Sequence, residues 1–329
     1  MARGRSGYDE ELCLIHDGTI PNLETLPKSF RSMEEWEVPE APRGWELSVA
    51  GAAAGALLSG GSPWGALAGL SVARAIGAYL GPIRDFRIEK FRDGRGAPLL
   101  FVDGFLTQSA TLEDWCEGLE RAYVGRPWYR LTWESQTLAA LGSAISKTAG
   151  VLRLARARSA FLFLELVRNP WHVALWKAER TGRLLGFLLA RTRGTTPITM
   201  IGHSLGARVI FEALQTLGAM GRRKVNDAVL LGAAVGRKDG PPWTLAKRAA
   251  RRIVNIHSRY DAVLKYLYVP GNLFLSDPAG LRPVSARGVT NIDASPLVRG
   301  HLLYPGALAR LLQVFSLRAP GGALRCPSR

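Results

Sequence analysis

The stretch ITMIGHSLGA at residues 198–207 constrains the fold of this chain more than any other. A short apolar run ends in the string GHSLG, and a helical pattern begins directly after it. A G-x-S-x-G string between a strand and a helix is typical of a nucleophile elbow, a turn so tight that Gly202 and Gly206 must lack side chains. We therefore expect Ser204 to be a strained, exposed nucleophile above the end of a strand. Backbone N–H groups at the start of the following helix favour negative charge at such a position.

The composition bounds the size of the core and the kind of partner. At 329 residues, the chain is long enough for one large α/β domain or two smaller ones. Lys and Arg outnumber Asp and Glu by 43 to 27, which gives a formal net charge of +16. Such a charge suits nucleic acid or an anionic membrane, but no RNA- or DNA-binding motif accompanies it. We therefore expect a membrane surface, rather than nucleic acid, as a partner.

Cysteine spacing and the N-terminal sequence bear on cofactors and on the compartment. Cys13, Cys116 and Cys326 share no short spacing, so the sequence predicts neither a metal site nor a disulfide framework. The first residues, MARGRSGYDEELCLIHDG, turn acidic without an apolar core, which is unlike a secretory signal. We expect a protein of the cytoplasm, or of the cytoplasmic face of a membrane, that needs no cofactor.

Two segments precede the part of the chain in which strands alternate with helices. Residues 1–46 are polar and contain four prolines, which predicts an irregular arm. Residues 47–82 form two Gly/Ala-rich apolar runs around a Ser-Gly-Gly-Ser-Pro-Trp break, which predicts a helical hairpin. Each run is shorter than the roughly 20 residues of a membrane span, and Arg74 lies within the second. Two interpretations remain: a hairpin in or on a bilayer, and a tightly packed soluble hairpin.

Residues 83–318 read as one α/β domain, followed by a flexible tail at 319–329. The order of elements predicts a mostly parallel, doubly wound sheet with helices on both faces, and the elbow makes this an α/β-hydrolase fold. A hairpin turn at 93–96 is expected to join the first two strands. The expected strands are 86–91, 98–102, 129–133, 198–202, 227–235, 252–258 and, as the last strand, 281–284 and 289–292. The expected helices are 112–123, 171–191, 205–217 and 305–315.

Residues 136–192 predict a helical insertion that is longer than a plain crossover between two strands. Asn169-Pro170-Trp171 is expected to break it and to start a second helix. Arginines beside an apolar run at 151–167 suit a lid or a membrane-docking surface. They equally suit a helix that is half buried against the sheet and keeps its arginine head groups in water.

An activated serine needs a base, and elimination among the histidines predicts which one. In this architecture the chain order is nucleophile, acid, histidine. Only His301 lies in a loop after the last expected strand. The other histidines precede the serine, lie inside the elbow or lie within a strand: His16, His172, His203 and His257.

The acid and the oxyanion donors are predicted from their places at strand ends. Asp261 follows the penultimate strand and is the expected acid, with Asp293 at the end of the final strand as the alternative. The backbone N–H of Leu205 is one expected oxyanion donor. The second is the N–H of Phe105, or of its neighbour Leu106, in the loop after strand 98–102.

Seven stretches carry a resemblance to a known family. The chain resembles the α/β-hydrolase-like family of the transmembrane and coiled-coil domain-containing protein four, whose core is a domain of unknown function. The matching stretches are VDGFLT (102–107), YRLTWES (129–135), RNPWHVAL (168–175), ITMIGHSLGARVI (198–210), AVLLGAAV (228–235), RIVNIHSRYD (252–261) and RGHLLYPGALARLL (299–312). The resemblance implies an α/β-hydrolase fold in which Ser204, Asp261 and His301 match the triad positions. It also implies that the hairpin at 47–82 corresponds to a membrane-associated segment.

Two hypotheses of function follow. The first is a serine hydrolase of the esterase or lipase kind that acts on a small-molecule or lipid ester at a membrane surface. Ser204 attacks the carbonyl, His301 accepts and returns the proton, and Asp261 fixes the imidazole. The second is a non-catalytic, membrane-anchored interaction or trafficking module on the same fold. A complete triad favours the first, because a scaffold needs none of the three groups.

Overall fold

A computed structural model describes most of the region expected to form the α/β domain. The described residues are 83, 86–104, 115–116, 119–120, 122–134, 159–192, 197–268 and 277–317, without the side chains of 159–170, 267 and 314–317. The arm at 1–46, the hairpin at 47–82, the first part of the insertion at 136–158 and the tail at 319–329 lie outside these residues. None of the described helices is both long enough and apolar enough to cross a membrane.

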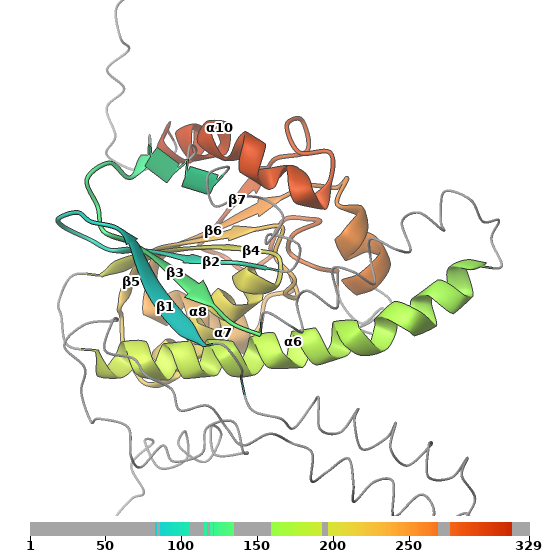
Figure 1. Ribbon diagram of the computed structural model, residues 1–329, viewed down its shortest axis with the longest axis horizontal. Helices are drawn as coiled ribbons and strands as arrows, with labels where there is room; N and C mark the ends of the chain where they lie inside the picture. Colours follow the sequence, from blue (N-terminus) through green and yellow to red (C-terminus); the bar gives the residue numbers. More distant parts are fainter. Residues whose placement is uncertain are drawn as a thin grey trace, which may run out of the picture.

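Seven strands form one sheet in the order β1-β3-β2-β4-β5-β6-β7 (Figure 1). Their bounds are β1 Arg87–Arg92, β2 Leu99–Val102, β3 Trp128–Thr132, β4 Ile198–His203, β5 Val225–Leu231, β6 Ala250–His257 and β7 Val289–Asp293. Every neighbouring pair is parallel except β1 and β3. The prediction of a mostly parallel sheet with the α/β-hydrolase fold is confirmed.

The first strand pairs differently from the sequence prediction. A turn at 93–96 predicted a hairpin between β1 and β2, but β1 pairs antiparallel with β3, which lies between them. The reason is that a strand has only two hydrogen-bonding edges. β2 uses one edge for β3 and the other for β4, so no edge is left for β1.

Helices cover both faces of the sheet, as expected. Figure 1 shows α6, α7 and α8 on one side of the strands and α10 on the other. The helix bounds are α6 Ser159–Arg191, α7 Leu205–Ala219, α8 Pro241–Ala249 and α10 Tyr304–Leu317, with a π-helix η3 at Leu264–Tyr268 and a 3-10 helix η4 at His301–Leu303. β2 alternates between the two layers, because Leu100 and Val102 join the core under α7 while Leu99 and Phe101 join the core under α10.

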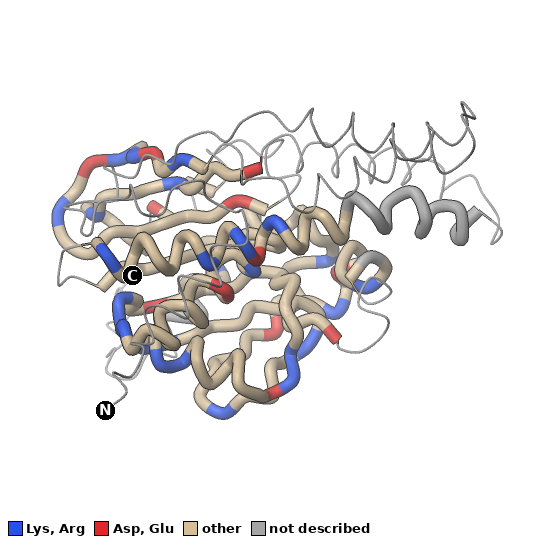
Figure 2. Tube along the Cα trace, turned by 90° about the horizontal axis from the view of Figure 1, so that it is seen from below, with Lys and Arg blue, Asp and Glu red and all other residues tan. Residues whose placement is uncertain are grey.

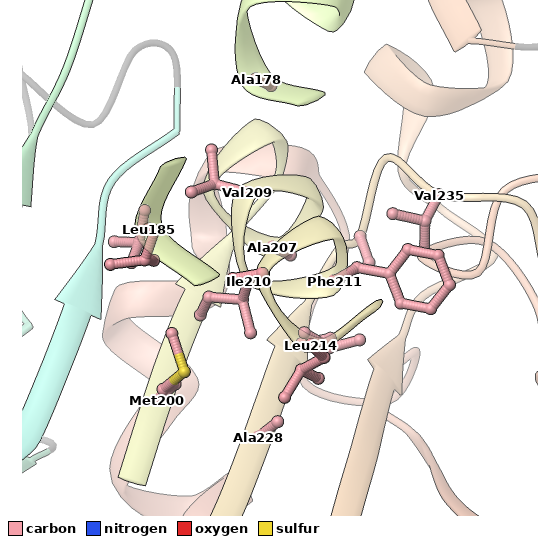
Figure 3. Close-up of a cluster of buried hydrophobic side chains, with 14 of the residues drawn as sticks. Ala178, Leu185, Met200, Ala207, Val209, Ile210, Phe211, Leu214, Ala228 and Val235 are labelled. Carbon is pink, nitrogen blue, oxygen red and sulfur yellow. The ribbon is translucent and has the colours of Figure 1, made fainter. Parts of the chain in front are cut away.

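Helix α7 is the centre of the larger core. Figure 3 shows its side chains between those of α6, such as Ala178 and Leu185, and those of the sheet, such as Met200 and Ala228. Two glycines let α6 approach α7 closely. A Cβ atom added to Gly182 would lie 2.4 Å from the carbonyl oxygen of Val209, too close for any side chain to be accommodated. Gly186 meets the backbone of α7 in the same way, one turn further on.

Two local predictions were wrong, and one helix was not predicted. Helix α6 continues without interruption past Pro170, where we expected a break. A proline costs an interior helix about 3 kcal/mol, and the buried residues that follow it, from Trp171 onward, supply enough packing to hold the helix together. Helix α8 was not expected, because its short, proline-initiated sequence has little helical periodicity. No strand forms at 281–284, and the last strand is β7 alone.

Charged groups are spread over the molecule, and some are buried. Figure 2 shows lysines and arginines recurring along many loops and helices of the described chain. Between α6 and α7, Glu179 accepts hydrogen bonds from Arg208 and Arg183, and Arg208 also lies 3.9 Å from Glu212. Burial raises the pKa of Glu212 to about 7, against the opposing effect of Arg208.

We expect Glu212 to make stability depend on pH. A carboxyl whose pKa is higher in the folded than in the unfolded state favours folding at low pH, and this contribution is lost as pH rises from about 4.5 to about 7. The loss is on the order of 3 kcal/mol. The free energy of unfolding, measured with urea at pH 5 and pH 8, should therefore change less with pH in Glu212→Gln than in wild type. Glu89→Gln, which changes an exposed carboxylate, is the control. If the free energy of unfolding depends on pH equally in all three proteins, Glu212 is not the source of the pH dependence.

Candidate active site

Ser204 joins strand β4 to helix α7 in a strained backbone conformation. Its φ of 57° lies in the left-handed region, which residues other than glycine rarely adopt. The neighbouring strand and loop hold it there. The Ser204 N–H donates to the carbonyl of Leu231 at 2.9 Å, and the Ser204 carbonyl accepts from the N–H of Ala234 at 3.3 Å. Such strain persists only where the surroundings over-determine it, as they do here.

Glycine flanks the serine because the backbones approach too closely for a side chain. A Cβ atom on Gly206 would lie 2.1 Å from the carbonyl oxygen of Val102. A Cβ atom on Gly202 would lie 2.7 Å from the carbonyl of Gly206. Neither glycine has a positive φ, so close approach, rather than an unusual backbone angle, explains both.

The structure brings Ser204, His301 and Asp261 together in one line of hydrogen bonds. The Oγ atom of Ser204 lies 2.8 Å from Nε2 of His301, and Nδ1 of His301 lies 2.6 Å from Oδ2 of Asp261. The three side chains follow β4, β6 and β7, whose carboxyl ends share one edge of the sheet. All three are buried, and the second carboxylate oxygen of Asp261 accepts from the N–H of Leu264 at 3.0 Å.

The alternative acid lies elsewhere. The Oδ1 atom of Asp293 accepts from the N–H of Ser295 at 2.8 Å, a local bond that closes the loop after β7. The sequence offered Asp261 and Asp293 as candidates for the acid. In the structure it is Asp261 that lies beside the imidazole of His301. His257 is the last residue of β6, which agrees with its expected place within a strand.

The exposure of the serine differs from the prediction. We expected an exposed hydroxyl, but Ser204 is 0 % exposed. His301 lies over its Oγ atom, and Gly104 passes so close that an added Cβ atom would lie 2.9 Å from the Cβ atom of Ser204. Leu205, one expected oxyanion donor, is the first residue of α7. Phe105, the other, lies outside the described residues, directly after Gly104.

His203 contributes to the site in a way that the sequence reasoning missed. Its Nε2 atom lies 3.0 Å from the carbonyl oxygen of His301, and the centroids of the two rings are 4.7 Å apart. Burial, and then the neighbouring His301, hold the pKa of His203 well below its ordinary value. The ring is therefore neutral, and its Nε2–H donates to the carbonyl. The signal in the sequence was its place as the last residue of β4, directly before Ser204, from which its ring reaches Trp115 and Tyr304.

Tyr304, one turn after His301, also lies against the site. A Cβ atom on Gly232, whose φ is 51°, would lie 2.9 Å from the ring of Tyr304 and 3.3 Å from Oδ2 of Asp261. Burial, and then the charge of Asp261, raise the pKa of Tyr304 well above its ordinary value, so the phenol is neutral. The lack of a side chain at Gly232 thus leaves room for both the Tyr304 ring and the Asp261 carboxylate.

Glu134, at the end of β3, has a structural contact in the described part of the chain. It forms a buried ion pair of 3.0 Å with Lys177, which connects the sheet to α6. Its φ of 44° shows that the chain turns sharply there. The described residues contain no group of three or more His, Cys, Asp or Glu side chains placed to hold a metal ion.

Comparisons with known proteins give a family and several relatives. Residues 159–318 match the family described as protein of unknown function (DUF726). The chain is 32% identical over 302 residues to the transmembrane and coiled-coil domain-containing protein STS1 of Oryza sativa subsp. japonica, covering 82% of this chain and 44% of that protein. It is 27% identical over 274 residues to the probable lipase MIL1 of Saccharomyces cerevisiae, covering 73% of this chain and 24% of that protein. The chain thus spans less than half the length of these relatives.

Among solved structures, the chain is similar to YbtT, a type II thioesterase from the yersiniabactin biosynthetic pathway. The TM-score is 0.38 at 15% identity, covering 70% of this chain and 96% of that chain.

Proposed function

This chain belongs to the DUF726 family and has the α/β-hydrolase fold, and we propose that it is a serine hydrolase that cleaves acyl esters. The observation that supports the proposal most directly is the line of hydrogen bonds from Ser204 through His301 to Asp261, with distances of 2.8 and 2.6 Å. A serine hydroxyl is a weak nucleophile at neutral pH, and such a line is the arrangement that activates it.

The proposed reaction has two stages. As the Oγ atom of Ser204 attacks the ester carbonyl carbon, His301 takes the hydroxyl proton at Nε2, and Asp261 stabilises the imidazolium that forms. The negative charge on the former carbonyl oxygen is stabilised by the N–H groups of Leu205 and Phe105. His301 then gives its proton to the departing alkoxide, which leaves an acyl-serine. In the second stage His301 removes a proton from water, the hydroxide attacks the acyl carbon, and the carboxylic acid leaves as Ser204 regains its proton.

We propose a lipid or another apolar acyl ester as substrate, at a membrane surface on its cytoplasmic side. The yeast relative is named a probable lipase and the rice relative a transmembrane protein, and these names support the proposal. The Gly/Ala-rich hairpin at 47–82 is the segment that we propose associates with the membrane. The reaction uses no cofactor.

Labelling by a fluorophosphonate probe tests the proposal. The probe reacts with an activated serine, so we expect the wild-type chain to be labelled and Ser204→Ala to be unlabelled. The exposed serine variant Ser285→Ala is the matched control and should be labelled like wild type. A folded wild-type chain that takes up no probe would contradict the enzyme hypothesis and favour the non-catalytic module.

A further inference from the structure

The exposed apolar side chains of the described chain gather at one edge of the sheet. Of six large apolar residues that are exposed there, five follow β6 or β7, at the carboxyl ends of the strands. These five are 40 to 56% exposed: Tyr260, Tyr266, Leu297, Leu302 and Leu303. The sixth, Val124, lies in the turn before β3, at the opposite edge. Single exposed apolar residues are common, but their concentration at one edge indicates an interaction surface.

Two hydrogen bonds join the segment after β6 to the segment after β7. The hydroxyl of Ser258, after β6, donates to the carbonyl of Val298, after β7, at 2.6 Å. The N–H of Arg259 donates to the hydroxyl of Ser295 at 3.1 Å. The two loops therefore form one unit beside His301 and Asp261. Four exposed apolar residues of these segments are named the apolar rim: Tyr260, Leu297, Leu302 and Leu303. Tyr266 lies further along the chain, in η3, and is not counted in the rim.

Cations accompany the apolar rim. The guanidinium carbons of Arg259 and Arg299 lie 5.3 and 5.7 Å from the centroid of the Tyr260 ring. Nearby, Nζ of Lys265 lies 5.4 Å from the ring of Tyr266. Within the described residues of the two loops, at 258–268 and 293–303, the exposed charged side chains are these three cations and Asp293. The surface therefore combines aliphatic and aromatic side chains with a net positive charge.

We propose that the apolar rim docks the protein onto the surface of an anionic phospholipid bilayer. The leucines would enter the boundary between head groups and acyl chains, Tyr260 would lie at the head-group level, and the arginines would bind lipid phosphates. Charge complementarity argues for this partner, since anionic head groups attract the three cations. The rim adjoins His301, so docking turns the site toward the bilayer. Only this last consequence rests on the proposed function, because the docking itself does not depend on catalysis.

Vesicle binding by the full chain tests the proposal. We expect binding to phosphatidylcholine vesicles to strengthen when phosphatidylserine is included and to weaken again at high salt. Leu302→Ser with Leu303→Ser should lower the partition coefficient at least tenfold. Arg259→Gln with Arg299→Gln should lower it by about fivefold for each arginine. The matched controls lie at the opposite edge and should bind like wild type: Val124→Ser for the leucines, and Arg222→Gln with Arg223→Gln for the arginines.

Hydrogen exchange supplies a second readout in case another segment also binds the vesicles. Docking predicts that backbone amides at 258–261 and 295–303 are protected by anionic vesicles, while those at 222–225 are not. Unchanged exchange at the rim would overturn the proposal, even where the chain still binds the vesicles through another segment. Protection that appears without vesicles and grows with protein concentration would identify a second copy as the occupant and overturn it as well.

The two proposals fail in distinguishable ways. Ser204→Ala should bind vesicles like wild type, because the serine plays no part in docking. Probe labelling in the absence of vesicles reports the site alone. Labelled protein that does not dock contradicts only the docking surface, and docked protein that takes up no probe contradicts only the enzyme.

Discussion

Asp261→Asn should lower the rate of probe attachment to Ser204 by a factor of about 10³ to 10⁴. The carboxylate oxygen Oδ2 lies 2.6 Å from Nδ1 of His301 and accepts a hydrogen bond from its N–H, which leaves Nε2 without a proton and able to accept the proton of Ser204. An asparagine amide can present an N–H at that position. The imidazole then carries its proton on Nε2 and cannot act as a base toward the serine. The substitution conserves shape and keeps an oxygen for the N–H of Leu264, so the fold should survive.

The rate constant of probe labelling measures this effect, with Asp293→Asn as the control. Asp293 accepts its bond from Ser295 and should be dispensable, so its variant should label within about twofold of wild type. The opposite ranking of the two variants would assign the acid to Asp293 instead.

Gly206→Ala should destabilise the fold by about 3 kcal/mol or more. The added methyl group would lie 2.1 Å from the carbonyl oxygen of Val102 in β2, which is backbone and cannot rotate away. Relief requires α7 to move off the sheet, and that movement breaks the packing of the larger core.

The same substitution at Gly306 separates this clash from the intrinsic effect of alanine. An added Cβ atom at Gly306, near the start of α10, has no neighbour within 4 Å. Gly306→Ala should therefore be neutral or stabilising by about 0.5–1 kcal/mol. Urea unfolding of the two variants and wild type measures the difference. Similar stabilities for both variants would show that α7 can shift away from β2 at little cost.

The elbow made the fold predictable, because the elbow itself can be identified from a short local sequence pattern. A serine between two glycines, after an apolar run and before a helix, requires a parallel sheet with its nucleophile at the carboxyl edge. That edge also predicts where a partner histidine and aspartate must lie, and the structure places His301 and Asp261 in contact there. Their catalytic role remains a prediction.

The features that could not be predicted depend on contacts between distant segments. The pairing of β1 with β3 is decided by competition for the edges of β2, which no local pattern records. The burial of Ser204 depends on Gly104 and His301, which belong to other loops. The contact of His203 with the carbonyl of His301 likewise joins two residues 98 positions apart.

These separations have a consequence for folding. Ser204 and His301 are 97 residues apart, and Asp261 and His301 are 40 residues apart. Their hydrogen bonds therefore require β4, β5, β6 and β7 to be paired in register. Long-range pairings form more slowly than local helices. During refolding, helical circular dichroism should recover before Ser204 becomes reactive toward the probe. The reactivity of the Ser204 hydroxyl toward the probe thus reports when the sheet is complete.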